Sequence, residues 1–90
     1  MQHLKASIYG RVQGVFYRMT AQKKAKNLGI KGWIKNMPDG SVYLEADGDE
    51  ESLKKFLNWC KKGPFLAKVK NIKKEFESET KGFKDFKIRF

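Results

Sequence analysis

The sequence predicts an α+β fold in which two helices lie on one face of an antiparallel sheet. Three observations support this class: several segments alternate apolar with polar residues, two segments repeat apolar residues at helical spacing, and turn sequences separate them. The chain has 90 residues, the size of one domain spanning residues 1–90. Hydrophobic residues make up 40% of it and aromatic residues 13%, so it can build a packed core.

A strand and a helix open the predicted fold. Residues 4–8 alternate apolar and polar side chains, which is the period of a strand with one buried face, and Gly10 ends this strand. Apolar residues then recur at helical spacing over 17–28. Gly29 follows as the expected C-cap of this helix.

A hairpin and a second helix come next. Residues 30–37 and 42–47 are predicted to pair, because Pro38-Asp39-Gly40 between them is a turn sequence. The second helix is expected over 49–62, with acids in its first turn and lysines in its last. Cys60 lies on the apolar stripe of this helix, so we expect a buried structural thiol.

Two further strands complete the predicted sheet. The first covers 67–77, where the apolar phase slips between Val69 and Ile72 and indicates a bulge. The last is the alternating segment 86–90. The order strand, helix, strand, strand, helix, strand is that of the ferredoxin-like fold, here with an extra C-terminal strand. Many functions share this fold, so function must be sought in a site.

The charge of the chain is strongly positive. Twenty Lys and Arg against ten Asp and Glu give a formal net charge of +10. Such a field attracts phosphorylated metabolites, nucleic acids or acidic membrane faces, and it also occurs on an ordinary lysine-covered soluble surface. Charge alone does not choose among these.

Cysteine content and hydropathy bear on the compartment. Cys60 is the only cysteine, which excludes an internal disulfide and a cysteine-based zinc cluster. No apolar run approaches the roughly 20 residues of a membrane span, and the start does not resemble a signal peptide. We therefore expect a cytoplasmic protein.

The most informative segment is the loop 10–18, at a strand-to-helix junction. The start of a helix exposes N–H groups without partners and the positive end of the helix dipole, which suits a phosphate group. Gly10 and Gly14 let the main chain turn sharply and approach an anion. Arg18 falls in the first helical turn, from where its guanidinium can reach two phosphate oxygens. An ordinary tight turn would also explain the two glycines.

This loop, Gly-Arg-Val-Gln-Gly-Val-Phe-Tyr-Arg, resembles the signature loop of the acylphosphatase family. A second segment, Gly32-Trp-Ile-Lys-Asn-Met-Pro-Asp-Gly-Ser-Val42, is similar to the second signature of that family, and Gly48 follows at the family's spacing. Both occur in the right order and on the expected elements. The resemblance extends to the ending Phe86-x-Ile88-x-Phe90 and so covers essentially the whole chain.

The resemblance implies an enzyme that hydrolyses the carboxyl–phosphate bond of small acyl phosphates without a metal or organic cofactor. It implies that Arg18 binds the phosphate charge and that the side-chain amide of Asn36 holds the attacking water. It also implies that main-chain N–H groups form a phosphate cradle, contributed by Gln13, Gly14, Val15, Phe16, Tyr17 and Arg18. Inorganic phosphate or sulfate should compete for this cradle. A monomer is expected, with no membrane or nucleic-acid partner.

Two positions and one loop depart from the commonest family pattern. Tyr17 stands where phenylalanine is usual, and Ile34 where a smaller residue is common, and both look like packing variation. The loop Gly63-Pro64-Phe65-Leu66 replaces one that is usually richer in proline and glycine. That change bears on the shape of the loop and on access for bulky acyl groups.

Structural interpretations exist for each candidate residue. Taken alone, Arg18 could be a helix-surface cation, and Asn36 could simply begin a turn. Met19 and Met37 are expected to be packing residues rather than ligands. His3, the only histidine, is expected to be exposed and without a function, because it lies at the start of a strand.

Two other function classes remain as alternatives. An RNA-binding module shares this fold, and residues 81–86 faintly resemble the start of its aromatic motif. Lys84 and Asp85 do not fit that motif, and the segment lies in or before the last strand rather than in the third. A regulatory domain without turnover is the other alternative, and the presence of both Arg18 and Asn36 favours catalysis over it.

Overall fold

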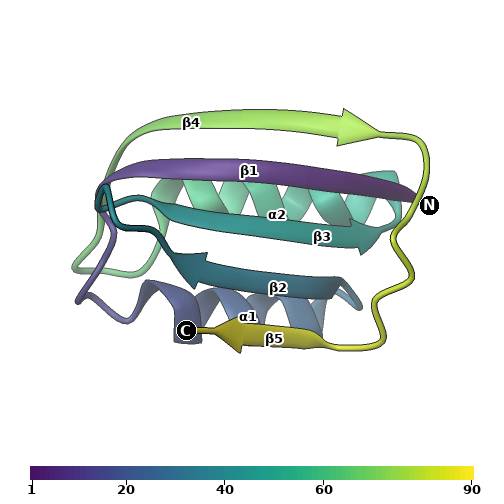
Figure 1. The fold of residues 1–90 in the computed structure, drawn as a ribbon, viewed down its shortest axis with the longest axis horizontal. Helices are drawn as coiled ribbons and strands as arrows, with labels where there is room; N and C mark the ends of the chain where they lie inside the picture. Colours follow the sequence, from purple (N-terminus) through teal and green to yellow (C-terminus); the bar gives the residue numbers. More distant parts are fainter.

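The computed structural model describes all residues from Met1 to Phe90. It contains five strands and two helices in the predicted order (Figure 1). These elements are β1 (Gln2–Arg11), α1 (Tyr17–Asn27), β2 (Lys31–Asn36), β3 (Val42–Gly48), α2 (Glu50–Lys62), β4 (Lys68–Glu77) and β5 (Phe86–Arg89). The α+β, ferredoxin-like arrangement with a fifth strand is therefore confirmed.

The strands form one sheet in the order β4-β1-β3-β2-β5. Strands β1 to β4 pair antiparallel, as predicted, but β5 pairs parallel to β2, with Ile34 opposite Ile88. The reason is the connection over residues 78–85, which crosses one end of the sheet from β4 to the opposite edge (Figure 1). Strand β5 thus starts at the end of the sheet where β4 finishes, and it has to run in the direction of β2.

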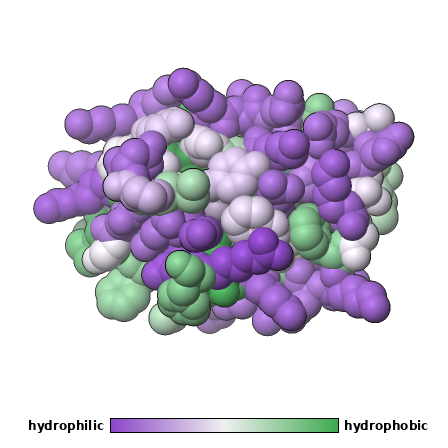
Figure 2. All heavy atoms as spheres, viewed as in Figure 1, coloured by the Kyte–Doolittle hydropathy of each residue, from purple (hydrophilic) through white to green (hydrophobic).

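Both helices lie on one face of the sheet (Figure 1), and the hydrophobic core fills the space between the helices and the sheet. The alternation in β1 places Leu4, Ala6 and Ile8 on this face, all buried. The opposite face of the sheet is largely hydrophilic (Figure 2). Cys60 is buried in this core, as predicted, and burial raises the pKa of its thiol to about 12.

A tyrosine hydroxyl connects the two helices. The main-chain carbonyl of Cys60, in the last turn of α2, would bond to the N–H of residue 64 if the helix continued. Residue 64 is proline and has no N–H. The hydroxyl of Tyr17, in the first turn of α1, donates to this carbonyl at 2.6 Å instead. Burial raises the pKa of Tyr17, so the phenol stays neutral and keeps its proton.

The predicted bulge lies where β1 leaves the sheet. Tyr9 pairs with Asn71 of β4 while Gly10 pairs with Val69, so Lys70 is the extra residue. Gly10 has φ 124°, and a Cβ atom there would collide with the main-chain oxygen of Lys68. Only glycine fits this close approach. The bulge thereby turns the chain out of the sheet toward the loop that precedes α1.

The prediction that His3 is exposed was wrong. Its ring is 0% exposed, because the crossing segment 78–85 covers this end of β1, and the Phe83 ring lies 6.0 Å away. Nδ1 of His3 lies 2.7 Å from an Asp47 oxygen, and Nε2 lies 3.0 Å from a Glu45 oxygen. Both ring nitrogens therefore lie within hydrogen-bond distance of a carboxylate.

Asp47 holds the crossing segment in place. Its carboxylate accepts hydrogen bonds from the main-chain N–H groups of Lys81, Gly82 and Phe83, at 3.0, 2.9 and 3.3 Å. Burial alone would raise the pKa of Asp47, but these bonds and the one from His3 outweigh it and hold the pKa below its ordinary value. We call His3, Glu45, Asp47 and residues 81–83 the His3 cluster.

Candidate active site

The elements that carry the predicted site meet at the end of the sheet opposite the His3 cluster. Strands β1, β2 and β5 all end there, and α1 begins there (Figure 1). A pocket of about 320 Å³ lies between them. It is lined by Val12, Gly14, Phe16, Tyr17, Arg18, Met19, Asn36, Ile88 and Phe90.

The loop before α1 turns through two residues in left-handed conformation. Gly14 has φ 73°, and Phe16, the N-cap of α1, has φ 63° and ψ 22°. None of the main-chain N–H groups from Gln13 to Arg18 donates a hydrogen bond to another group of the protein. These groups lie at the positive end of the α1 dipole, which makes the loop a potential anion site.

The side chain of Gln13 ties this loop to the hairpin turn. Its Nε2 donates to the main-chain oxygens of Met37 and Ser41, at 2.8 Å each. Asp39 closes the same turn by accepting from the N–H and the hydroxyl of Ser41, at 2.9 and 2.6 Å. Because β2 ends just before this turn, Gln13 sets the position of the loop relative to Asn36. The family resemblance implied only a main-chain role for Gln13, and nothing in the local sequence indicates that its side chain bonds to a residue 24 positions away.

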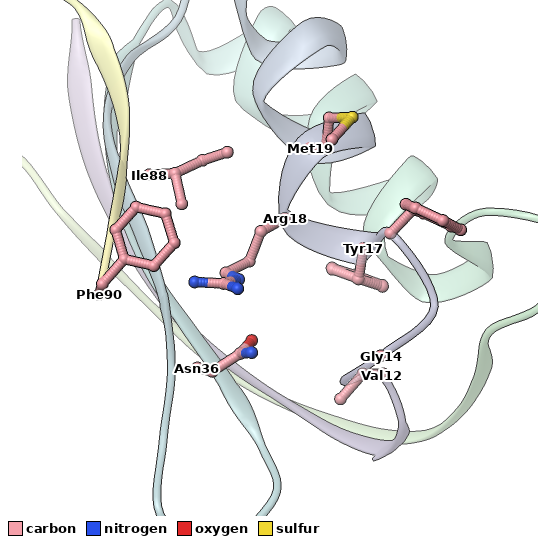
Figure 3. A pocket seen from close by; sticks show the side chains of 9 residues that line it. Val12, Gly14, Tyr17, Arg18, Met19, Asn36, Ile88 and Phe90 are labelled. Atoms are coloured by element: carbon pink, nitrogen blue, oxygen red, sulfur yellow. The ribbon is translucent and has the colours of Figure 1, made fainter.

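Arg18 reaches the pocket from the first turn of α1 (Figure 3). Its Nη1 donates to the main-chain oxygen of Arg89 at 3.2 Å, and its guanidinium carbon lies 5.0 Å from the centre of the Phe90 ring. No carboxylate of the protein forms an ion pair with it. One bond to β5 therefore orients the guanidinium, while its charge and most of its N–H donors stay available.

Asn36, the last residue of β2, points into the same pocket (Figure 3). Its side-chain oxygen is buried and has no hydrogen-bond partner in the protein. A buried polar atom without a partner is unfavourable, so a polar ligand or a water at this point would satisfy it.

The pocket brings together most of the predicted residues, but not all. Gly14, Phe16, Tyr17, Arg18 and Asn36 line it, whereas the side chain of Val15 packs in the core. Met19 was expected to pack but is 63% exposed at the pocket.

Sequence reasoning also missed three lining residues, Val12, Ile88 and Phe90. Val12 belongs to the motif and was passed over. The alternation of β5 gave no sign that Ile88 and Phe90 would lie beside α1, because that depends on the parallel pairing with β2.

No acidic side chain and no imidazole lines the pocket. Nowhere in the structure do three or more His, Cys, Asp or Glu side chains gather in a way that could hold a metal ion. Neither helix has the length and apolar character needed to cross a lipid bilayer.

Comparison with known proteins decides the family. The family model described as acylphosphatase matches residues 4–88. The chain belongs to the acylphosphatase family. An acylphosphatase of Thermotoga maritima is 46% identical over 90 residues, covering 100% of this chain and 99% of that protein. One of Methylococcus capsulatus is 43% identical over 88 residues, covering 98% and 96%.

The fold agrees with that of solved acylphosphatases. The crystal structure of acylphosphatase from Bacillus subtilis has a TM-score of 0.97 and 33% identity, and the match covers 100% of both chains. The resemblance seen in the two signature segments is thus confirmed at the level of the whole chain. The roles of individual residues in this acylphosphatase-family chain stay predictions.

Proposed function

We propose that this protein hydrolyses the carboxyl–phosphate bond of acyl phosphates, releasing a carboxylate and inorganic phosphate, in the pocket between Arg18 and Asn36. The observation that carries the proposal is the row of N–H groups without acceptors from Gln13 to Arg18, beside a guanidinium that no acid neutralises. Membership of the acylphosphatase family supports the same reaction.

The phosphate cradle and Arg18 have complementary tasks. The main-chain N–H groups are oriented before the substrate arrives, so stabilising its charged oxygens requires no reorganisation of the loop. The guanidinium adds a full positive charge and a two-pronged donor for two phosphate oxygens. Charge on the transferred phosphoryl group is then stabilised without a metal.

Asn36 positions the nucleophile. Its side-chain oxygen, which lacks a partner, accepts a hydrogen bond from a water molecule and holds it beside the phosphorus atom. The water oxygen forms the new bond to phosphorus, and the electron pair of the broken bond stays on the carboxylate. A carboxylate is a good leaving group, so no general acid is required. No carboxylate or imidazole side chain lines the pocket, so a phosphoryl oxygen of the substrate accepts the proton of the water.

A phosphate-release assay tests this proposal. Wild type should hydrolyse benzoyl phosphate and acetyl phosphate, with EDTA having no effect and inorganic phosphate competing with substrate. Arg18→Ala should lower kcat/KM by about a thousandfold or more, as for other arginines that stabilise a phosphoryl group. Arg11→Ala, which removes an exposed arginine outside the pocket, is the matched control and should stay close to wild type. Equal activity of the two variants would contradict the proposal.

A further inference from the structure

Three large apolar side chains stand exposed around the mouth of the pocket. Phe16 is 65% exposed, Met19 is 63% exposed and Phe90 is 95% exposed, and all three line the same pocket as Arg18. We call them the apolar rim. Apolar side chains gather at the corner where β5 ends and α1 begins, on a face that is otherwise mostly hydrophilic (Figure 2). Exposed apolar groups clustered at a pocket are a common mark of a binding site.

Packing does not explain why an aromatic residue occupies position 16. Phe16 adopts a left-handed conformation that is unfavourable for a residue with a Cβ atom and that glycine would adopt freely. The main-chain oxygen of Phe16 accepts bonds from the N–H and hydroxyl of Thr20, at 3.1 and 2.8 Å, so the conformation is held. The ring itself remains mostly in solvent. A strained, exposed aromatic residue beside an anion site points to a ligand contact.

The polar and apolar parts of the pocket are separate. Arg18 and Asn36 are the only lining residues with polar side chains besides Tyr17, whose hydroxyl is bonded to the Cys60 carbonyl in the interior. The other lining side chains are those of the rim, Val12 and Ile88, together with the Tyr17 ring, and all of these surfaces are apolar. A polar acyl group would find no hydrogen-bond partner there, whereas an apolar group would remove apolar surface from water.

We propose that the apolar rim is the acyl-group subsite and that it selects acyl phosphates with a ring or a branched apolar chain over those with a small or polar acyl group. This inference rests on the proposed function and adds its substrate class. Phe16 contributes most, because its left-handed main chain holds the ring at the side of the cradle. There the ring lies next to the acyl group that is attached to the bound phosphate.

The test compares two substrates that share the phosphate and differ in the acyl group. Wild type should show a kcat/KM for benzoyl phosphate at least tenfold above that for acetyl phosphate, with the difference mainly in KM. Phe16→Ala should reduce this ratio by about tenfold, and Met19→Ala and Phe90→Ala by less, since apolar pockets discriminate by factors of this order. Phe16→Leu should restore part of the ratio. Phe65→Ala is the control, because Phe65 is 99% exposed but lies outside the pocket, and its ratio should equal that of wild type.

Direct binding provides a second measurement that does not depend on turnover. By calorimetry, phenylphosphonate should bind wild type more tightly than methylphosphonate, and Phe16→Ala should remove most of that difference. A ratio unchanged in all three rim variants, with normal hydrolysis of acetyl phosphate, would overturn the subsite and leave the proposed function standing. Absence of hydrolysis of either substrate by wild type would overturn both.

Discussion

The two ends of the β-sheet treat their polar groups in opposite ways. In the His3 cluster, Asp47 accepts hydrogen bonds from an imidazole and three main-chain N–H groups. At the pocket, the N–H groups of residues 13–18 and the oxygen of Asn36 have no partner in the protein. Both ends hold a charged side chain, but Asp47 is paired with the protein whereas Arg18 forms no ion pair.

The difference separates stability from binding. Polar groups that hydrogen-bond within the protein stabilise the fold. Removing one partner leaves the other groups buried without a hydrogen bond, which lowers stability. Polar groups held in place without partners add little to stability and are available to a ligand. We therefore expect substitutions at the pocket to change rate, and substitutions in the His3 cluster to change stability.

The largest effect that would sharpen this contrast is expected from Asn36→Ala. Its kcat should fall by about 10²–10³, which corresponds to about 2.7–4 kcal/mol, because the attacking water loses its positioning contact. KM should change little, and the free energy of unfolding should not fall, since the lost oxygen had no partner. Steady-state kinetics and urea unfolding measure the two quantities. Asn58→Ala on the exposed side of α2 is the control, and a normal kcat with a raised KM in Asn36→Ala would contradict the role.

The reverse pattern is expected for Asp47→Ala. Three N–H groups and the His3 ring lose their acceptor, so the free energy of unfolding should fall by about 2–3 kcal/mol, while kcat stays near that of wild type. Asp39→Ala is the matched control, because Asp39 also accepts hydrogen bonds but lies exposed in a turn, and its unfolding midpoint should move little. If Asp47→Ala lost activity and kept its stability, the division between the two ends would be wrong.

Acid should weaken the same end of the molecule. The pKa of Asp47 lies below its ordinary value of 3.8 in the folded protein, so its contribution to stability is present above about pH 5. That contribution is lost progressively as the pH falls through 3.8 and then through the lower folded value, because the unfolded state binds the proton first. We expect the free energy of unfolding, measured with urea at a series of pH values from 7 to 2, to fall more steeply below pH 5 in wild type than in Asp47→Ala. Parallel curves for the two proteins would exclude Asp47 as the group responsible.

The smallest effect is expected from Tyr17→Phe. Losing the hydroxyl leaves the Cys60 carbonyl without a donor at the end of α2, which should cost about 1 kcal/mol of unfolding free energy. Tyr9→Phe is the control, since the Tyr9 hydroxyl donates to no group of the protein. Thermal and urea unfolding should show a lower midpoint for Tyr17→Phe alone, and equal midpoints would mean that solvent satisfies the carbonyl.

Local patterns predicted most of the fold. The alternation of 4–8 corresponds to β1, and the expected helices at 17–28 and 49–62 agree with α1 and α2 to within one residue. Strand period, helix period and turn residues act over a few neighbours, so the sequence displays them directly. The bulge before residue 72 was visible for the same reason, as a slip in the apolar phase.

Contacts between distant segments could not be predicted this way. His3 looked like an exposed residue because nothing near it in sequence indicates that 78–85 would cover it. Phe90 looked like the end of a strand because its place beside Arg18 depends on β5 pairing parallel to β2. The hydrogen bond from the Gln13 side chain to the Met37 carbonyl likewise forms only because the loop before α1 packs against the hairpin turn.

The sequence by itself therefore determined the elements, the family, the loop with Arg18 and the second signature segment with Asn36, since each shows in a run of neighbouring residues. Only the tertiary structure decided at which end of the sheet the polar groups are paired within the protein and at which end they are left without partners. The physical reason is that a polar group finds a hydrogen-bond partner only where another segment of the protein packs against it and supplies one. For Asp47 this is the crossing segment, and for the loop before α1 no segment of the protein supplies an acceptor.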